Sequence, residues 1–279
     1  MIYLNGEWMP IEDAKIPVLD RGFIFGDGIY EVIPVYRRKP FRAAGHLARL
    51  ARSLASISIP NPYSDARWME LIADIIARQP FENQAVYFQV TRGVAKRDHA
   101  FPTEVTPTVF MMSNPLATPS EETYAKGVAC VTAVDNRWLR CDIKATALLP
   151  NLLLRNQAVA AGAYEAVLVR DGEVTEGSSS NVFMVKDGRV WTPPLSHLIL
   201  PGVTRALLID VLQGCGIEVA EAPVPIALLR AADEIWFTST TRDLVAVARL
   251  DGATVGNGSQ PLAERAYREF QLYKGLRLR

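Results

Sequence analysis

One stretch of this chain reads Arg137-Trp138-Leu139-Arg140-Cys141-Asp142-Ile143-Lys144 and runs on into an apolar, helix-like segment over 145–151. Lysine is scarce, with seven lysines against 23 arginines, and most of the seven stand at ordinary surface positions. Lys144 differs because apolar residues flank it on both sides. An amine held against apolar surface can lose its charge and form a Schiff base with a carbonyl. On this stretch alone, a lysine whose head group reaches water at the end of an element is the preferred interpretation.

The composition is that of a globular protein with a sizeable core. A length of 279 residues predicts about two domains at ~150 residues each. Hydrophobic residues make up 49% of the chain and charged residues 22%, which disfavours disorder. The 30 basic residues equal the 30 acidic ones, so the formal net charge is zero. A nucleic-acid or anionic-membrane partner would call for a basic excess, so we expect neither.

The cysteines and the apolar runs bear on where the protein works. Cys130, Cys141 and Cys215 form no CxxC pair, which disfavours a disulfide framework and a metal site and favours a reducing compartment. Residues 1–20 show no signal-peptide pattern, and no apolar stretch reaches the ~18 residues of a membrane span. The sequence therefore predicts a cytoplasmic protein.

Hairpins and helices are mixed in both halves of the chain. Asn5-Gly6 predicts an N-terminal hairpin, and Asp171-Gly172 and Asp187-Gly188 predict two more in the second half. Three glycines within 22–28 mark a tight backbone. Apolar residues at spacings of three and four predict a helix over 43–58. Further helices are predicted over 64–78, with Ser64 as a plausible N-cap, and near 148–162, 206–212 and 260–274. This mixture indicates an α+β fold rather than a doubly wound parallel sheet. A polar, proline-rich stretch without periodicity follows residue 113. We therefore predict an N-terminal domain over 1–116, a linker over 117–122, and a C-terminal domain over 123–279 that carries Lys144.

Two segments could hold a phosphate. Gly202-Val203-Thr204 opens a predicted helix, whose free amides and dipole favour an anion. Ser239-Thr240-Thr241 ends a predicted strand, where clustered hydroxyls and amides could bind the other phosphate oxygens. Taken singly, the first segment is better explained by a helix cap at Thr204, and the second by a polar turn.

Two charged residues stand in unusual surroundings. Arg49 lies beside the apolar stripe of the predicted helix over 43–58, and its fork of donors suits a phosphate dianion. An arginine whose stem packs while its head reaches water explains the position equally well. Glu176 projects from the polar segment 175–181, where a carboxylate could keep a pyridine nitrogen protonated and make the ring an electron sink. Ordinary turn composition is the other explanation of this segment.

Five stretches, in order along nearly the whole chain, carry a resemblance: Asp20–Val32, Tyr87–Gly93, Arg137–Lys144, Thr175–Phe183 and Thr238–Thr241. In them the chain resembles the fold type IV pyridoxal-phosphate transaminases, a family that includes branched-chain aminotransferases, D-amino-acid aminotransferases and aminodeoxychorismate lyases. It is most similar to the D-amino-acid aminotransferases. The resemblance implies a smaller N-terminal α+β domain and a larger C-terminal domain with a mixed, barrel-like β-sheet.

The resemblance also implies pyridoxal 5'-phosphate as the cofactor, with no metal. Lys144 resembles the lysine that forms the Schiff base, and Glu176 resembles the partner of the pyridine nitrogen. Leu200 is similar to the residue packed on the cofactor ring. The other expected cofactor-binding residues are Arg49, Ser179, Val203, Thr204 and Thr240.

For the substrate, the resemblance implies an Arg-x-His pair that binds the carboxylate, with a tyrosine beside it. Here these residues are Arg97, His99 and Tyr30. Asp98 stands between the pair where a small neutral residue is expected, so it either weakens carboxylate binding or points to solvent. The family's site lies at a homodimer interface, with this loop reaching in from the partner subunit.

The implied activity is ping-pong transamination between D-amino acids such as D-alanine and 2-oxo acids such as 2-oxoglutarate or pyruvate. An (R)-selective amine transaminase or an aminodeoxychorismate lyase on the same scaffold is the alternative, together with a branched-chain L-amino-acid enzyme. A pyridoxal-phosphate-binding dimer without catalysis is a further alternative. A hydrolase built on one of three histidines is remote, because no Gly-x-Ser-x-Gly motif accompanies them.

Overall fold

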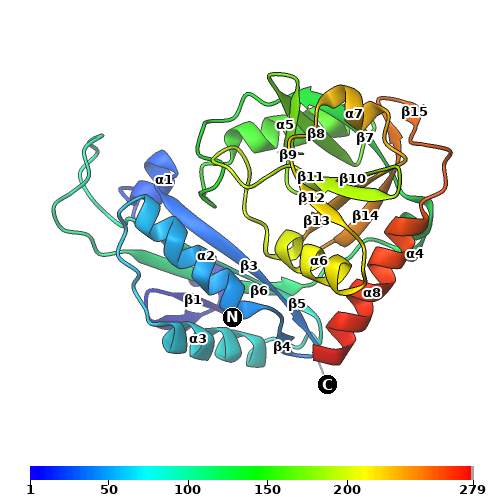
Figure 1. Cartoon of the computed structure of the whole chain (residues 1–279). Helices are drawn as coiled ribbons and strands as arrows, with labels where there is room; N and C mark the ends of the chain where they lie inside the picture. The colour runs from blue at the N-terminus through cyan, green and yellow to red at the C-terminus, as the bar shows by residue number, and fades with distance from the viewer. Residues whose placement is uncertain (278–279) are drawn as a thin grey trace. The chain divides into compact units, whose positions relative to one another are not determined.

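The computed structural model describes residues 1–277, which form two compact units (Figure 1). Unit 1 consists of Met1–Ala117 and Ile143–Leu148, and unit 2 consists of Thr118–Asp142 and Leu149–Arg277. Each unit contains helices and a β-sheet, which confirms the predicted α+β class.

Unit 1 is built on an antiparallel sheet of six strands. These are β1 (Ile2–Leu4), β2 (Glu7–Met9), β3 (Gly28–Tyr36), β4 (Lys39–Pro40), β5 (Gln84–Thr91) and β6 (Thr108–Pro115). Their order across the sheet is β2-β1-β6-β5-β3-β4, and every pair is antiparallel. The predicted hairpin at Asn5-Gly6 joins β1 to β2, and both turn residues have positive φ, as this turn requires.

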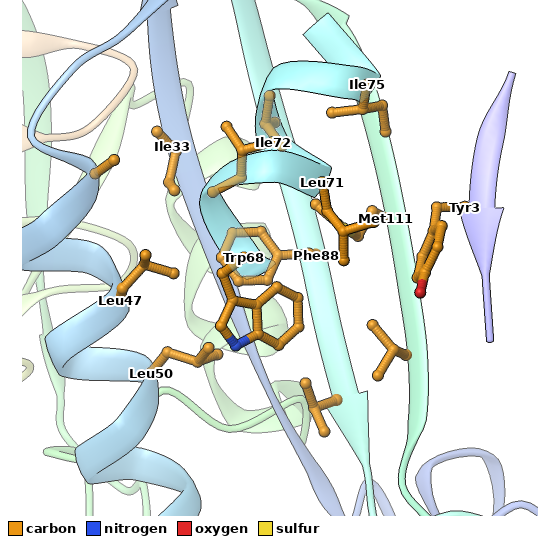
Figure 2. Packing of buried hydrophobic residues seen from close by; sticks show 14 of the residues in the cluster. Tyr3, Ile33, Leu47, Leu50, Trp68, Leu71, Ile72, Ile75, Phe88 and Met111 are labelled. Atoms are coloured by element: carbon orange, nitrogen blue, oxygen red, sulfur yellow. The ribbon is translucent and has the colours of Figure 1, made fainter. Parts of the chain in front are cut away.

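Two helices, α2 (Ala43–Ser56) and α3 (Asp65–Ala77), pack against this sheet. α2 confirms the prediction from apolar spacing, and α3 confirms the helix predicted after Ser64, which caps it by accepting a hydrogen bond from the Arg67 amide. Figure 2 shows the resulting core, in which side chains of both helices meet those of the strands. Trp68 and Phe88, from α3 and β5, are fully buried there with ring centroids 5.1 Å apart. This packing holds the unit together and fixes β3 beneath α2.

Two short helices precede β3: the 3-10 turn η1 (Ile11–Asp13) and α1 (Arg21–Phe25). Asp20 caps α1 by accepting from the Gly22 amide at 2.8 Å, and Gly26 ends the helix at φ 67°. The sequence indicated a tight backbone here but not a helix, because five residues are too few for a periodic pattern. The result is that α1 turns the chain directly into β3.

Unit 2 is built on nine strands. They are β7 (Val128–Val134), β8 (Glu165–Arg170), β9 (Glu173–Gly177), β10 (Asn181–Lys186), β11 (Arg189–Thr192), β12 (Val219–Glu221), β13 (Glu234–Ser239), β14 (Asp243–Leu250) and β15 (Ala253–Thr254). Eight follow the order β12-β11-β10-β13-β14-β7-β8-β9, and β15 pairs with β14. Parallel and antiparallel pairs are mixed. Since β9 also packs against β10, the sheet curls into part of a barrel, as the resemblance implied.

The helices of unit 2 are α4 (Glu121–Lys126), α5 (Leu149–Ala160), α6 (Val203–Gly214), α7 (Ile226–Arg230) and α8 (Pro261–Arg277). The sequence predicted α5, α6 and α8 but not the short α4 and α7. One cluster of buried side chains in this unit runs through β10, β13 and β14, with Phe237 and Val245 fully buried. Over residues 1–277, no helix has both the length and the apolar character needed to cross a membrane.

The segment Ile143–Leu148 groups with unit 1 although it lies between two parts of unit 2 in the sequence. The Tyr30 amide donates to the Lys144 carbonyl at 2.9 Å, and the Thr146 amide donates to the Gly28 carbonyl at 2.9 Å. Ile143 also joins the core of unit 1. Lys144 was predicted to lie in the C-terminal domain, whereas these contacts attach its segment to β3.

Candidate functional site

Five of the predicted site residues, Lys144 among them, belong to unit 1. A bridge between Ile29 and Ala145 holds the lysine segment against β3. The half-buried Lys144 side chain places its Nζ 4.2 Å from the centroid of the Tyr30 ring. Tyr30 in turn stacks on Tyr87 at 5.6 Å between centroids. The structure therefore brings together the predicted amine and the predicted tyrosine.

Arg49, on α2, is almost fully buried and paired with a carboxylate that the sequence analysis did not single out. Its Nε donates to Glu31 Oε1 at 2.7 Å, and its second terminal nitrogen donates to Glu31 Oε2 at 2.9 Å. His46, one turn earlier on α2, contacts the same Oε2 through Nδ1 at 2.8 Å. The three side chains form one buried cluster beside the apolar stripe of α2.

The charges of this cluster follow from its burial. Burial acts to raise the pKa of Glu31, but the Arg49 guanidinium and the His46 ring outweigh it and bring the pKa down to about 2. Burial lowers the pKa of His46 despite the neighbouring carboxylate. Glu31 is therefore ionised and His46 neutral at physiological pH, and the pair holds the Arg49 guanidinium in a fixed orientation.

Arg97 and His99 lie in the exposed segment between β5 and β6. Their side chains both approach the Phe25 ring: the Arg97 guanidinium is 5.3 Å from its centroid and the His99 ring is 5.8 Å away. Asp98 Oδ1 accepts a hydrogen bond from the Ala100 amide at 3.0 Å. The unexpected acidic residue thus closes a local turn around His99.

In unit 2, Glu176 lies at the end of β9 and is buried. Its Oε1 accepts from Arg137 at 2.6 Å, and its Oε2 accepts from the Leu200 amide at 3.0 Å and from Asn181 Nδ2 at 3.2 Å. Burial raises the pKa of Glu176 to about 7, although Arg137 and the Leu200 amide act to lower it. A further cation beside this carboxylate would favour its ionised form.

Arg137 is buried between two carboxylates, a role that the sequence analysis missed. Besides Glu176, it binds Asp135 in a two-point pair, with both hydrogen bonds at 2.9 Å. Burial acts to raise the pKa of Asp135, but Arg137 and the Thr175 hydroxyl bring it down to about 2. Arg137 therefore fixes Glu176 in place. The Arg137–Lys144 stretch contains it, but no sequence pattern pairs it with residue 176.

The start of α6 adjoins this carboxylate. Gly202 is the N-cap residue, and no side chain caps the helix, so the alternative role of Thr204 as a capping hydroxyl is not seen. Asn181 Nδ2 bonds both Glu176 and the Leu200 carbonyl. A Cβ on Gly202 would lie 2.1 Å from Asn181 Oδ1, so the backbone approaches this amide as closely as only glycine allows.

The end of β13 carries buried hydroxyl groups. Thr238 pairs in register with Asn181, and the turn 240–242 follows. Thr238 Oγ1 and Ser239 Oγ are buried, and neither has a hydrogen-bond partner among residues 1–277. Thr240 is half-buried at the start of the turn. Unsatisfied buried hydroxyls are uncommon and fit a site whose ligand completes them.

Ser179 is exposed, and its hydroxyl bonds other side chains of unit 2. It donates to Glu165 Oε2 at 2.9 Å and accepts from Arg242 at 3.2 Å. Arg242 also pairs with Glu165 at 2.6 Å. These contacts tie the segment after β9 to the turn after β13. Over residues 1–277 no group of three or more His, Cys, Asp or Glu side chains is arranged to hold a metal ion.

The family described as Amino-transferase class IV matches residues 28–250. A D-alanine aminotransferase of Staphylococcus aureus (strain MW2) is 39% identical over 274 residues, which cover 98% of this chain and 97% of the relative. One of Bacillus licheniformis is 39% identical over 258 residues, or 92% of this chain and 91% of the relative.

Solved structures show the same fold. A branched-chain amino acid aminotransferase of Escherichia coli superposes with a TM-score of 0.89 at 28% identity, covering 96% of this chain and 92% of that one. The branched-chain aminotransferase of the thermophilic archaeon Thermoproteus uzoniensis, solved with norvaline, gives a TM-score of 0.86 at 25% identity, with 97% and 93% covered. The family match spans most of the chain, and the relatives span nearly all of it. The chain therefore belongs to the class IV aminotransferases.

Proposed function

We propose that this protein is a pyridoxal-phosphate-dependent transaminase that moves the amino group between D-amino acids such as D-alanine and 2-oxo acids such as pyruvate or 2-oxoglutarate. The observation that carries the substrate class is the 39% identity to proteins named D-alanine aminotransferase over nearly their whole length. The loop with Arg97 and His99 supports it, because a paired cation and imidazole suit a carboxylate. We assign the reaction to the cytoplasm, in line with the unpaired cysteines.

The residues present fit pyridoxal 5'-phosphate. Glu176 is a buried carboxylate whose donors do not fully offset its burial, so a protonated pyridine nitrogen would complete it. The uncapped start of α6, at Val203 and Thr204, offers amides to a phosphate. Thr240 adjoins the unsatisfied hydroxyls at the end of β13. We further assign the cofactor's ring face to Leu200, the phosphate also to Arg49, and support of the surrounding turn to Ser179.

When bound, the cofactor supplies a protonated pyridine ring that takes up the electron pair left at the substrate α-carbon. Lys144 Nζ would hold the cofactor, and it would take the substrate α-proton as general base and return a proton as general acid. Glu176 holds the charge at the pyridine nitrogen, and Arg137 keeps Glu176 in position.

We propose that Arg97 and His99 bind the substrate carboxylate, with the Tyr30 hydroxyl beside it. In this proposal the protein is a homodimer, and each loop serves the site of the partner subunit. Asp98 is compatible with this role, since its carboxylate is engaged by the Ala100 amide in its own turn. By fixing the carboxylate, the loop selects both for acids and for the hand of the α-carbon.

Branched-chain L-amino-acid transamination is the second candidate, because the solved structures of the same fold carry the branched-chain name. Their identity of 28% and 25% is well below the 39% of the D-alanine aminotransferases. An (R)-selective amine transaminase or an aminodeoxychorismate lyase has no need of the Arg97–His99 pair in this form. The pair therefore favours a D-amino acid.

The test is a single half-reaction followed by the absorbance of the bound cofactor. D-alanine should bleach the cofactor absorbance, and pyruvate should restore it. D-glutamate, L-alanine and (R)-1-phenylethylamine serve as comparisons. We expect D-alanine to react at least about a hundredfold faster than L-alanine, the discrimination that two or three fixed contacts provide. A faster reaction with L-alanine or with the amine would contradict the substrate assignment, and no bleaching with any of them would contradict catalysis.

A further inference from the structure

The loop that carries Arg97 and His99 has almost no secondary structure of its own. Between β5 and β6, residues 92–107 make only one isolated strand bridge, from Val94 to Asp20. Residues 96–101 are mostly exposed. Two side chains that must meet a small carboxylate nevertheless need positions fixed to within about 1 Å. Something outside the loop must therefore hold it.

Arg21, at the start of α1, is the group that reaches the loop. It is only 3% exposed, and its Nη1 donates to the Asp98 carbonyl at 2.6 Å and to the Ala100 carbonyl at 3.5 Å. These carbonyls lie on either side of His99 in the sequence. A single guanidinium thus bonds the backbone on both sides of a residue assigned to the substrate.

Asp27 fixes Arg21 and a second arginine at once. Its Oδ2 accepts from Arg21 Nε at 2.7 Å and from Arg92 Nε at 2.7 Å, and its Oδ1 accepts from Arg92 at 2.9 Å. Arg92 also donates to the carbonyls of Ile57 and Ser58 at the end of α2. The anchor of the loop is therefore built into the folded part of unit 1.

Aromatic rings complete the anchor. The Phe25 ring, on α1, lies 4.8 Å from the Arg21 guanidinium and 5.3 Å from that of Arg97. The Phe101 ring, on the loop, lies 3.6 Å from the guanidinium of Arg92. Contacts at these distances between a guanidinium and a ring are attractive. They hold the loop on both sides of His99, at Arg97 and at Phe101.

We propose that Arg21 is a positioning residue for substrate recognition, which holds the backbone on both sides of His99 so that Arg97 and His99 meet the substrate carboxylate together. This inference rests on the proposed role of the Arg97–His99 pair. Arg21 itself does not touch the substrate. Loss of Arg21 should weaken binding of amino acids while leaving the proton transfers at Lys144 intact.

The experiment compares holoenzymes of the wild type, Arg21→Gln, Phe101→Leu and the control Arg67→Gln. Arg67 is an exposed residue on α3 that pairs with Glu70, outside the loop. Two quantities are measured: the D-alanine dependence of the half-reaction rate, and hydrogen–deuterium exchange of the amides of residues 95–101. The rate measurement separates the half-saturating D-alanine concentration from the limiting rate. The exchange measurement reports how well the loop is ordered, and it does not depend on enzyme activity.

For Arg21→Gln we expect the half-saturating D-alanine concentration to rise about tenfold, with a limiting rate within about twofold of wild type, since only orientation is lost. Exchange of the loop amides should become faster in the same variant. Phe101→Leu should show both effects to a smaller extent, and Arg67→Gln neither. Because Phe101 is exposed, its variant decides the question if Arg21→Gln does not fold.

Unchanged exchange and unchanged saturation in the variants that fold would overturn the proposal, and so would a limiting rate that falls as much as the affinity. Failure of the proposed function is distinguishable, because wild type itself would then not react with D-alanine. The exchange comparison would still show whether Arg21 holds the loop.

Discussion

Glu31 determines the charge state of the buried cluster that it forms with His46 and Arg49 in unit 1. Fully buried on β3, it binds Arg49 and His46 together, and its pKa falls to about 2 from an ordinary value of 4.5. A carboxylate with a lowered folded-state pKa stabilises the fold above its unfolded pKa, and that contribution is lost as the pH falls through the folded value. The relevant window is therefore pH 4.5 down to pH 2.

We expect the free energy of unfolding of the wild type to fall by about 3 kcal/mol more than that of Glu31→Gln over this window, as a shift of this size implies. The variant should be less stable at neutral pH, because Arg49 is then buried without its anion. Denaturant titrations at a series of pH values measure both quantities. Parallel pH profiles for the two proteins would show that Glu31 does not carry this ion pair.

At the scale of residues, candidate site residues could be predicted from the sequence where a charged side chain stands among apolar residues. Arg49 and Lys144 stand out in the sequence because a charge adjoins apolar residues, and the structure places both in unit 1 as buried or half-buried side chains. Their partners were not predictable. Glu31 and Arg137 are 18 and 39 residues away from Arg49 and Glu176, and no local pattern encodes such pairs.

At the scale of elements, the backbone at the start of α6 requires glycine at residue 202. Asn181 is pinned by hydrogen bonds to Glu176 and to the Leu200 carbonyl, so it cannot easily move away from a Cβ on Gly202. The same helix ends at Gly214, where a Cβ would meet nothing within 4 Å. The two glycines provide a matched pair for substitution.

Gly202→Ala should displace Asn181 and the first amides of α6, and we expect cofactor affinity to fall about tenfold, the cost of one strong hydrogen bond. Gly214→Ala should leave affinity unchanged and raise stability by up to about 1 kcal/mol, because alanine favours a helix over glycine. Titration of the apoenzyme with the cofactor measures the affinity, and thermal unfolding measures the stability. Equal affinities of the two variants would contradict the close approach at Gly202.

Element prediction succeeded where a pattern was long or its ends were marked. Apolar spacing predicted α2, Ser64 marked the start of α3, and Asn-Gly or Asp-Gly pairs predicted the hairpins. Helices of five or six residues, such as α1 and α7, escaped because they make fewer than two turns. α1 matters most, since it carries Arg21.

At the scale of the whole molecule, the proposal requires two copies of the chain. If Arg97 acts in the partner's site, then Lys144 and Arg97 of one chain belong to different sites. Variants that lack one or the other are then expected to be inactive for different reasons. Mixing them separates action within a chain from action between chains.

Lys144→Ala and Arg97→Ala dimers, each nearly inactive, should regain activity after joint unfolding and refolding. About a quarter of wild-type activity is expected at equal amounts, because half of the dimers are hybrids with one intact site. The control refolds each variant separately. Lack of recovery, with hybrids demonstrated by a mass tag, would show that Arg97 serves its own chain or that no dimer forms.

The fold class could be predicted from the sequence because both halves mix hairpins with helices. The sequence could not predict that residues 143–148 belong to unit 1. That segment pairs with β3 through Tyr30 and Gly28, more than 110 residues earlier, so only the three-dimensional fold reveals it. The orientation of the Asp98 side chain also could not be predicted, because its carboxylate accepts a hydrogen bond from the backbone amide of Ala100 in the same turn.

The most direct measurement concerns the lysine itself. Borohydride treatment of the coloured holoenzyme fixes the bond between the cofactor and its lysine, and peptide mapping then locates the label. The account predicts that the label is on Lys144 alone, and that it is absent from Lys144→Ala. A label on Lys15, Lys39, Lys96, Lys126, Lys186 or Lys274, or no label on the wild type, would contradict it.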